Sequence, residues 1–67
     1  MNKHEAEKIL RDNGYETELR GGIVFVPYNK DEMDPFDSVR ELLRTNGYEG
    51  SFGTEGRKNA GNGENQN

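Results

Sequence analysis

An eight-residue phrase occurs twice in the chain, and this repeat constrains the fold more than any other feature. Residues 9–16 read ILRDNGYE and residues 42–49 read LLRTNGYE, so six of the eight positions are identical at an offset of 33 residues. Solenoid repeats have similar lengths, but at least three copies are normally needed to bury a continuous core. Two copies therefore predict one supersecondary unit used twice within a single small domain.

The first copy has the pattern of an amphipathic helix that stops at a glycine. Ala6, Ile9 and Leu10 follow the i, i+3, i+4 spacing of one helix face. Asn2 and Glu5 have the spacing of a capping box. The dipeptide at 13–14 is Asn-Gly, which favours a helix end because glycine tolerates the left-handed conformation. A helix is thus predicted over residues 3–13, followed at once by a strand that begins at Tyr15.

The second copy has the same pattern with a clearer start. Asp34 before Pro35 is typical of an N-cap followed by proline at the first helical position. The predicted buried stripe consists of Phe36, Val39, Leu42 and Leu43. Another Asn-Gly ends the helix, which is predicted over residues 35–46, and Tyr48 is expected to start the next strand.

A hairpin is predicted between the two copies. Residues 15–20 alternate strictly, residues 23–26 are rich in β-forming side chains, and Gly21-Gly22 between them is a two-residue turn signal. Strands are expected over 15–20, 23–27 and 48–54, with Pro27 ending the second because proline cannot donate to a ladder.

These elements predict an α+β fold with the order α-β-β-α-β in a single domain over residues 1–54. The crossover through the second helix should make the third strand parallel to the second and place both helices on one face of a three-stranded sheet. Such a domain is like a ferredoxin-like split unit without its first strand. Residues 55–67 hold one alanine and no other apolar side chain, so a disordered tail is expected there.

The uncovered face of that sheet is the candidate interaction surface, and its composition depends on the hairpin register. With a two-residue turn, the outward side chains are Glu16, Glu18, Arg20, Ile23 and Phe25. A three-residue loop would instead bury Ile23 and Phe25 and expose the valines. Either register leaves apolar side chains among charges, a composition that often marks a contact surface.

Charge and composition disfavour several function classes. The net charge is -4, which opposes general binding to phosphate backbones. The chain has no cysteine, hence no disulfide and no thiolate metal site. Apolar runs are short, and the first residues lack the apolar stretch of a signal peptide. We therefore expect a cytoplasmic location and no membrane segment.

No residue pattern indicates catalysis, a metal or a cofactor. His4 is the only histidine and has no recognisable catalytic partners. The acidic run at 31–34 lacks the spacing of a calcium loop, and capping already explains Asp34. The hairpin explains Gly21-Gly22, which has no phosphate-loop pattern around it. A non-enzymatic chain is therefore expected.

Two resemblances to known families accompany these patterns. Residues 4–26, with a leucine-ended helix, Asn-Gly-Tyr, a strand and a glycine turn, resemble the start of HicA-type toxins, small ribonucleases with a fold like that of double-stranded-RNA-binding domains. That family has a catalytic histidine after the turn glycine, where this chain has Ile23 after Gly22. Residues 19–28 (LRGGIVFVPY) and 37–43 (DSVRELL) resemble small proteins encoded on conjugative transposons of Gram-positive gut bacteria. This second resemblance implies a bacterial cytoplasmic accessory protein of a mobile element and no activity.

Two functions from different classes remain as expectations. The first is a protein-interaction or adaptor module, with a homodimer as one form, that uses the open sheet face or a free strand edge. The second is a nucleic-acid-binding accessory protein, for which Arg11, Arg40 and Arg44 would form a basic strip on the two helices.

Overall fold

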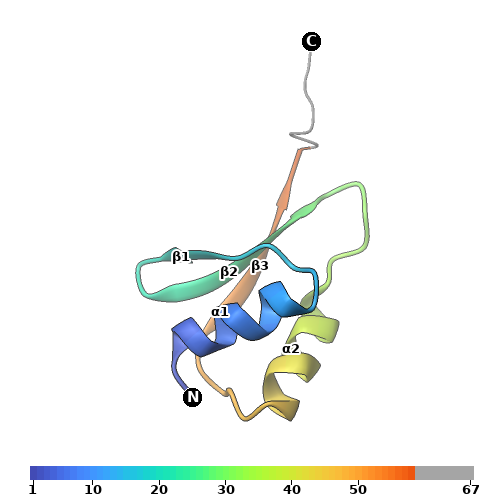
Figure 1. The fold of residues 1–67 in the computed structure, drawn as a ribbon. Coiled ribbons are helices and arrows are strands. Elements are labelled where there is room, and N and C mark those ends of the chain that lie inside the picture. Colours follow the sequence, from blue (N-terminus) through green and yellow to red (C-terminus); the bar gives the residue numbers. More distant parts are fainter. Residues whose placement is uncertain (59–67) are drawn as a thin grey trace.

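The computed structural model describes residues 1–58 and confirms the predicted α+β fold and element order. Two helices and three strands follow one another along the chain (Figure 1). They are α1 (Lys3–Asp12), β1 (Glu18–Arg20), β2 (Ile23–Asn29), α2 (Phe36–Thr45) and β3 (Phe52–Arg57).

The sheet is mixed and has β2 at its centre. Its order is β1-β2-β3, with β1 antiparallel and β3 parallel to β2. Arg20 pairs with Ile23, so Gly21-Gly22 forms the two-residue turn and the three-residue alternative is wrong. Both turn glycines have positive φ, which glycine adopts without strain.

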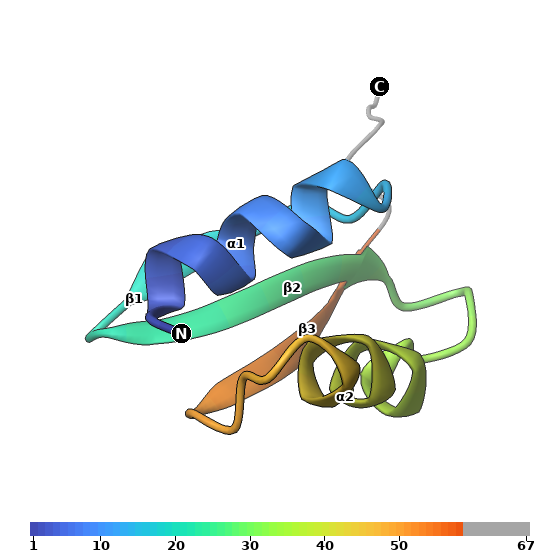
Figure 2. The same cartoon turned by 60° about the horizontal axis from the view of Figure 1, so that its bottom comes forward.

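The helices cover one face of the sheet and share a single core with it. Figure 2 shows α1 along β2 and α2 beside β3. Alternation along β2 directs Val24 and Val26 to this face, where both are buried. The remaining buried hydrophobic members of the core come from the helices and from the loop after α2, and are Ala6, Leu10, Val39, Leu43 and Tyr48. Phe36 of α2 stacks on Phe52 of β3 with 4.9 Å between ring centroids, although Phe36 is more exposed than predicted.

Both copies of the Asn-Gly-Tyr phrase end their helices with the same hydrogen bonds. The Tyr15 and Tyr48 amides donate to the carbonyls of Leu10 and Leu43, at 3.0 and 2.8 Å. Each glycine donates to the arginine carbonyl three residues before it, at 3.0 Å in both copies. Each asparagine side chain donates to the carbonyl four residues before it, at 2.8 Å in both copies. These bonds form a Schellman motif, which requires positive φ at the glycine and explains φ values of 92° and 90° at Gly14 and Gly47.

Alanine at Gly47 tests this helix end. A side chain at φ 90° is strained even though the space around Gly47 is open, so Gly47→Ala should lower the free energy of unfolding by about 1–2 kcal/mol. Chemical denaturation checks the value. Gly47→Asn should cost less, because asparagine tolerates positive φ better, and an equal cost for both variants would contradict the Schellman explanation.

The two tyrosines do not start strands, contrary to the prediction. The strands begin later, at Glu18 and at Phe52. Tyr48 packs into the core with 8% of its surface exposed, and its hydroxyl donates to the Ser51 carbonyl at 2.8 Å. The segment between α2 and β3 therefore wraps around the Tyr48 ring, and the strand begins only after this loop.

Pro27 does not end β2, which continues to Asn29. The Lys30 amide donates to the Arg57 carbonyl at 2.9 Å, so the even-numbered residues of this segment direct their backbone groups towards β3. Pro27 is odd-numbered and its nitrogen faces the other side, where the pairing with β1 reaches only as far as Phe25. The missing donor of Pro27 thus costs no ladder bond.

The predicted boundary between domain and tail is wrong by a few residues. Glu55, Gly56 and Arg57 belong to β3, where they pair with residues 27–29 of the extended β2. The rest of the predicted tail from residue 59 lies outside the described residues. At the start of α2 the N-cap is Pro35, without a side-chain cap bond, so the prediction of Asp34 as N-cap and Pro35 as first helical residue is wrong by one position. Asp34 precedes the cap and still accepts a hydrogen bond from the Phe36 amide at 2.9 Å.

Candidate functional site

The candidate site is the face of the sheet that the helices leave open. Strand alternation and the hairpin register place Glu18, Arg20, Ile23 and Phe25 on this face, as the sequence predicted. Glu16 precedes β1 and lines a hollow beside the loop that leaves β2. The open face also carries Glu55 and Arg57 of β3, which the sequence analysis assigned to a tail.

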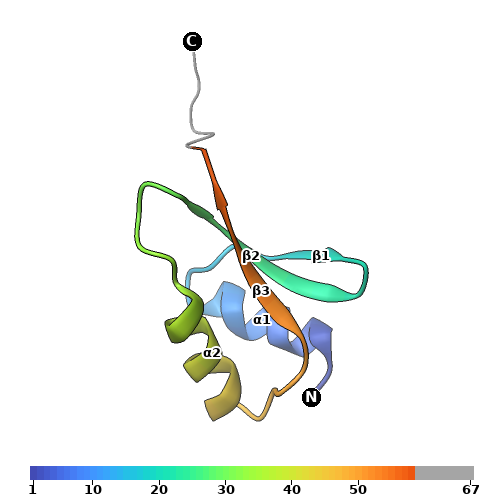
Figure 3. The same ribbon diagram turned by 180° about the vertical axis from the view of Figure 1, so that it is seen from behind.

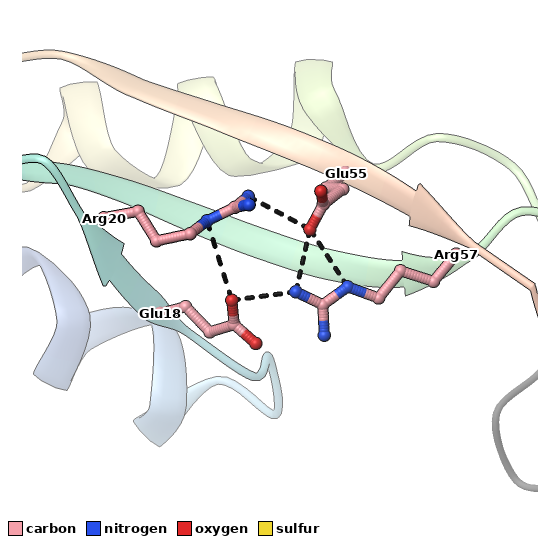
Figure 4. Close-up of polar contacts among 4 residues, drawn as sticks. All are labelled: Glu18, Arg20, Glu55 and Arg57. Carbon is pink, nitrogen blue, oxygen red and sulfur yellow. Dashed lines mark hydrogen bonds and ion pairs between the residues drawn. The ribbon is translucent and has the colours of Figure 1, made fainter.

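Four charged side chains form a connected network across this face, shown in Figure 4. We call Glu18, Arg20, Glu55 and Arg57 the ion-pair quartet. Arg57 Nη2 lies 2.8 Å from Glu18 Oε1 and 2.8 Å from Glu55 Oε1. Arg20 Nη2 lies 3.0 Å from Glu55 Oε1, and Arg20 Nε lies 3.8 Å from Glu18 Oε1. Each arginine therefore contacts both carboxylates, and the network spans the sheet from β1 to β3.

A short motif repeated on the outer strands explains the quartet. Glu-x-Arg occurs at 18–20 on β1 and at 55–57 on β3. Because β1 is antiparallel and β3 parallel to β2, the two motifs run in opposite directions. Each glutamate thereby comes near the arginine of the other motif, and these long side chains reach across the central strand. This repetition is the signal in the sequence that could have revealed Glu55 and Arg57.

The quartet is electrically balanced and ordered by hydrogen bonds. Hydrogen bonding from Arg57 lowers the pKa of both Glu18 and Glu55, opposed in part by desolvation. The two carboxylates in turn raise the pKa of Arg57. The four side chains are between 35% and 47% exposed, so water screens these contacts and their contribution to stability is small.

The lowered pKa values predict a specific pH dependence. A carboxylate whose folded-state pKa lies below its unfolded value of about 4 stabilises the fold above that value, and the stabilisation disappears as pH falls through the folded-state pKa. Urea denaturation from neutral to acid pH should show a larger stability loss for the wild type than for Arg57→Gln, which lacks the main cause of both shifts. Lys58→Gln, at an exposed position just after β3, should keep the wild-type pH dependence. Parallel curves for the wild type and Arg57→Gln would contradict the shifts.

The aromatic side chain on the open face is covered by part of the quartet. The Arg20 guanidinium lies 4.3 Å from the centroid of the Phe25 ring, a cation–π contact. A Cβ at Gly53 would lie 3.0 Å from Phe25 Cε1, so this ring also rests close against the glycine. Phe25 is half-buried as a result, whereas Ile23 is 36% exposed and remains the apolar part of the face.

Each arginine of the predicted basic strip contacts a polar or acidic neighbour. Arg11 donates to Thr17 Oγ1 at 2.9 Å, and Arg40 lies 3.6 Å from Asp37. Arg44 lies 2.9 Å from Glu41 and lowers the pKa of that carboxyl by hydrogen bonding. Arg40 and Arg44 line one hollow of about 250 Å³, and Arg11 is not part of it.

A second hollow, of about 440 Å³, lies between the end of α1, the second half of β2 and the loop that follows β2. Tyr28 lines it, and desolvation followed by the negative charge of Asp34 raises the pKa of its hydroxyl. The hollow is open and has a mixed lining that includes Glu16, Met33 and Lys58. No group of side chains around it has a recognisable catalytic arrangement among the described residues.

Membrane and metal sites are the remaining classes to consider. In residues 1–58 no helix has both the length and the apolar character needed to cross a membrane. The same part of the chain contains no cluster of three or more His, Cys, Asp or Glu side chains arranged to hold a metal ion. Comparison of the chain with protein-family models, with curated proteins and with solved structures gives no match.

Proposed function

We propose that this chain is a non-enzymatic protein-interaction module that binds through its sheet. One observation carries the proposal: the helices cover a single face, and the other face presents an ordered set of charges beside the exposed Ile23. Both outer strands also have a free edge in the described residues (Figure 3). Pairing with such an edge is a frequent mode of protein recognition.

The electrostatics of the open face favour a protein partner over a nucleic acid. The quartet holds two positive and two negative charges in mutual contact, so the face offers no excess of positive charge to phosphates. The guanidinium of Arg20 also occupies one side of the Phe25 ring, which a stacked base would need. A protein partner whose surface carries charges of both signs could instead form ion pairs with the arginines and glutamates of the quartet.

A cross-linking experiment tests the use of the open face. A photo-reactive amino acid at position 23 should give discrete cross-linked protein species in cells that express the full chain, because Ile23 is exposed beside the quartet. The matched control places the same group at Ser38, which is exposed on α2. Equal cross-linking at both positions, or none at position 23, would contradict use of the face.

A nucleic-acid-binding accessory is the second candidate, and one local feature favours it. Arg40 and Arg44 flank a hollow whose lining includes Tyr48 and Phe52, and aromatic and arginine side chains together can hold an unstacked base. Titration with a single-stranded oligonucleotide at low salt tests this: amide signals around these residues should shift, and the shifts should vanish at high salt. The proposal for either function includes a cytoplasmic accessory role on a mobile element, in keeping with the resemblance of residues 19–28 and 37–43 to transposon-encoded proteins.

A further inference from the structure

We propose that the partner of the free β3 edge is the β3 edge of a second copy of this chain, paired antiparallel so that Glu55 lies opposite Arg57 of the second copy. This inference rests on the proposed function and names the partner and the register. The two sheets would then join into one sheet of twice the width, with all helices on the same side.

The edge of β3 is suited to strand addition. β3 has six residues and contains no proline, whereas β1, the other edge, has only three. Short edge strands offer few backbone groups to a partner. The end of β3 near Arg57 also extends beyond both helices, so neither covers it (Figures 1 and 3).

The backbone groups available at this edge belong to Thr54 and Gly56. The Arg57 carbonyl accepts a hydrogen bond from Lys30 and so points into the sheet. Because successive residues of a strand direct their amide and carbonyl groups to opposite sides, Thr54 and Gly56 direct theirs to the free edge. Gly56 is exposed and has no side chain to obstruct a second strand.

Charge complementarity selects one register for the pair. With Gly56 opposite Gly56 of the second copy, Glu55 faces Arg57 of the second copy and Arg57 faces its Glu55. Shifting the second copy by two residues in one direction would place Glu55 opposite Glu55 of the second copy. The same shift in the other direction would place Arg57 opposite its Arg57. Slips by a single residue would turn the open-face charges to the helix side. Like charges directly opposite each other destabilise antiparallel pairs, so the remaining register is favoured.

The same complementarity already operates inside the chain. The Glu-x-Arg motif of β1 runs opposite to that of β3, and the two form the quartet. A second copy of β3 would present this motif again in the opposite direction on the other side of β3. Two glycines, Gly53 and Gly56, leave β3 with few side chains to specify register, so the charges must do so.

A mixing experiment with purified full chains tests the pairing. Glu55→Lys alone places a lysine opposite Arg57 in its own dimer, and Arg57→Glu alone places a second glutamate opposite Glu55. Each variant should associate about tenfold or more weakly than the wild type in analytical ultracentrifugation. An equimolar mixture should regain association. In the mixed dimer the introduced lysine of one copy faces the introduced glutamate of the other, and the retained Arg57 faces the retained Glu55.

A matched control separates the edge contact from the quartet. Arg20→Glu breaks contacts within the quartet from the β1 side but leaves the β3 edge unchanged, so it should associate like the wild type. Recovery in the mixture also shows that both single variants are folded. A wild type that stays monomeric at millimolar concentration, a mixture that does not regain association, or a loss of association in Arg20→Glu would each overturn the inference.

These outcomes are distinguishable from a failure of the proposed function. Association of purified chains reports on the β3 edge, whereas cross-linking from position 23 in cells reports on the open face. Cross-linking to another protein without association of purified chains would overturn the second-copy pairing and leave the interaction module standing.

Discussion

Replacing Leu43 with alanine is expected to unfold much of the protein at room temperature. The Leu43 side chain is 1% exposed and packs in the only core cluster of the described residues. Truncation of a buried leucine costs about 2–5 kcal/mol, and a chain of this size has a total stability of roughly 3–5 kcal/mol. Circular dichroism with urea denaturation should therefore show a large loss of folded protein and a midpoint near or below zero denaturant.

The neighbouring residue provides the control. Leu42→Ala removes the same atoms one position earlier on α2, where the side chain is only partly buried against the core. It should cost clearly less than Leu43→Ala. Equal losses in the two variants would contradict the orientation of α2 and hence the assignment of the buried face.

Gly50→Ala should produce the next largest effect. An alanine Cβ at this position would lie 2.6 Å from both the ring Cζ and the hydroxyl of Tyr48. That ring is buried and its hydroxyl is bound to the Ser51 carbonyl, so it cannot move aside freely. Overpacking of this kind costs about 1–3 kcal/mol. Chemical denaturation should show that loss.

Ser51→Ala is the matched control for Gly50→Ala. It introduces the same residue at the next, exposed position and keeps the backbone carbonyl that binds Tyr48, so stability should change by less than about 0.5 kcal/mol. A neutral Gly50→Ala would show that the loop does not wrap the Tyr48 ring as described.

The element order was predictable because local signals agreed with one another. The capping box of Asn2 and Glu5 is present, with both hydrogen bonds at 2.9–3.0 Å. Each Asn-Gly pair ends a helix, and Gly21-Gly22 turns the hairpin in the predicted register. These features depend on a few adjacent residues, and short-range physics determines them.

Strand boundaries and half of the quartet were not predictable because they depend on distant partners. Tyr15 and Tyr48 have high strand propensity, but tertiary packing keeps both outside the strands. Residues 55–57 have no apolar side chain, and they form a strand because they pair with 27–29 of β2 and with charges on β1. Composition alone therefore assigned Glu55 and Arg57 to a tail.

A dilution series of amide NMR spectra tests most directly whether the chain associates through its sheet. With signals assigned, resonances of β3 and of the open face should shift together between millimolar and tens of micromolar concentration, while those of the exposed faces of α1 and α2 stay fixed. Spectra that do not change over this range, or shifts confined to the helices, would contradict self-association through the sheet.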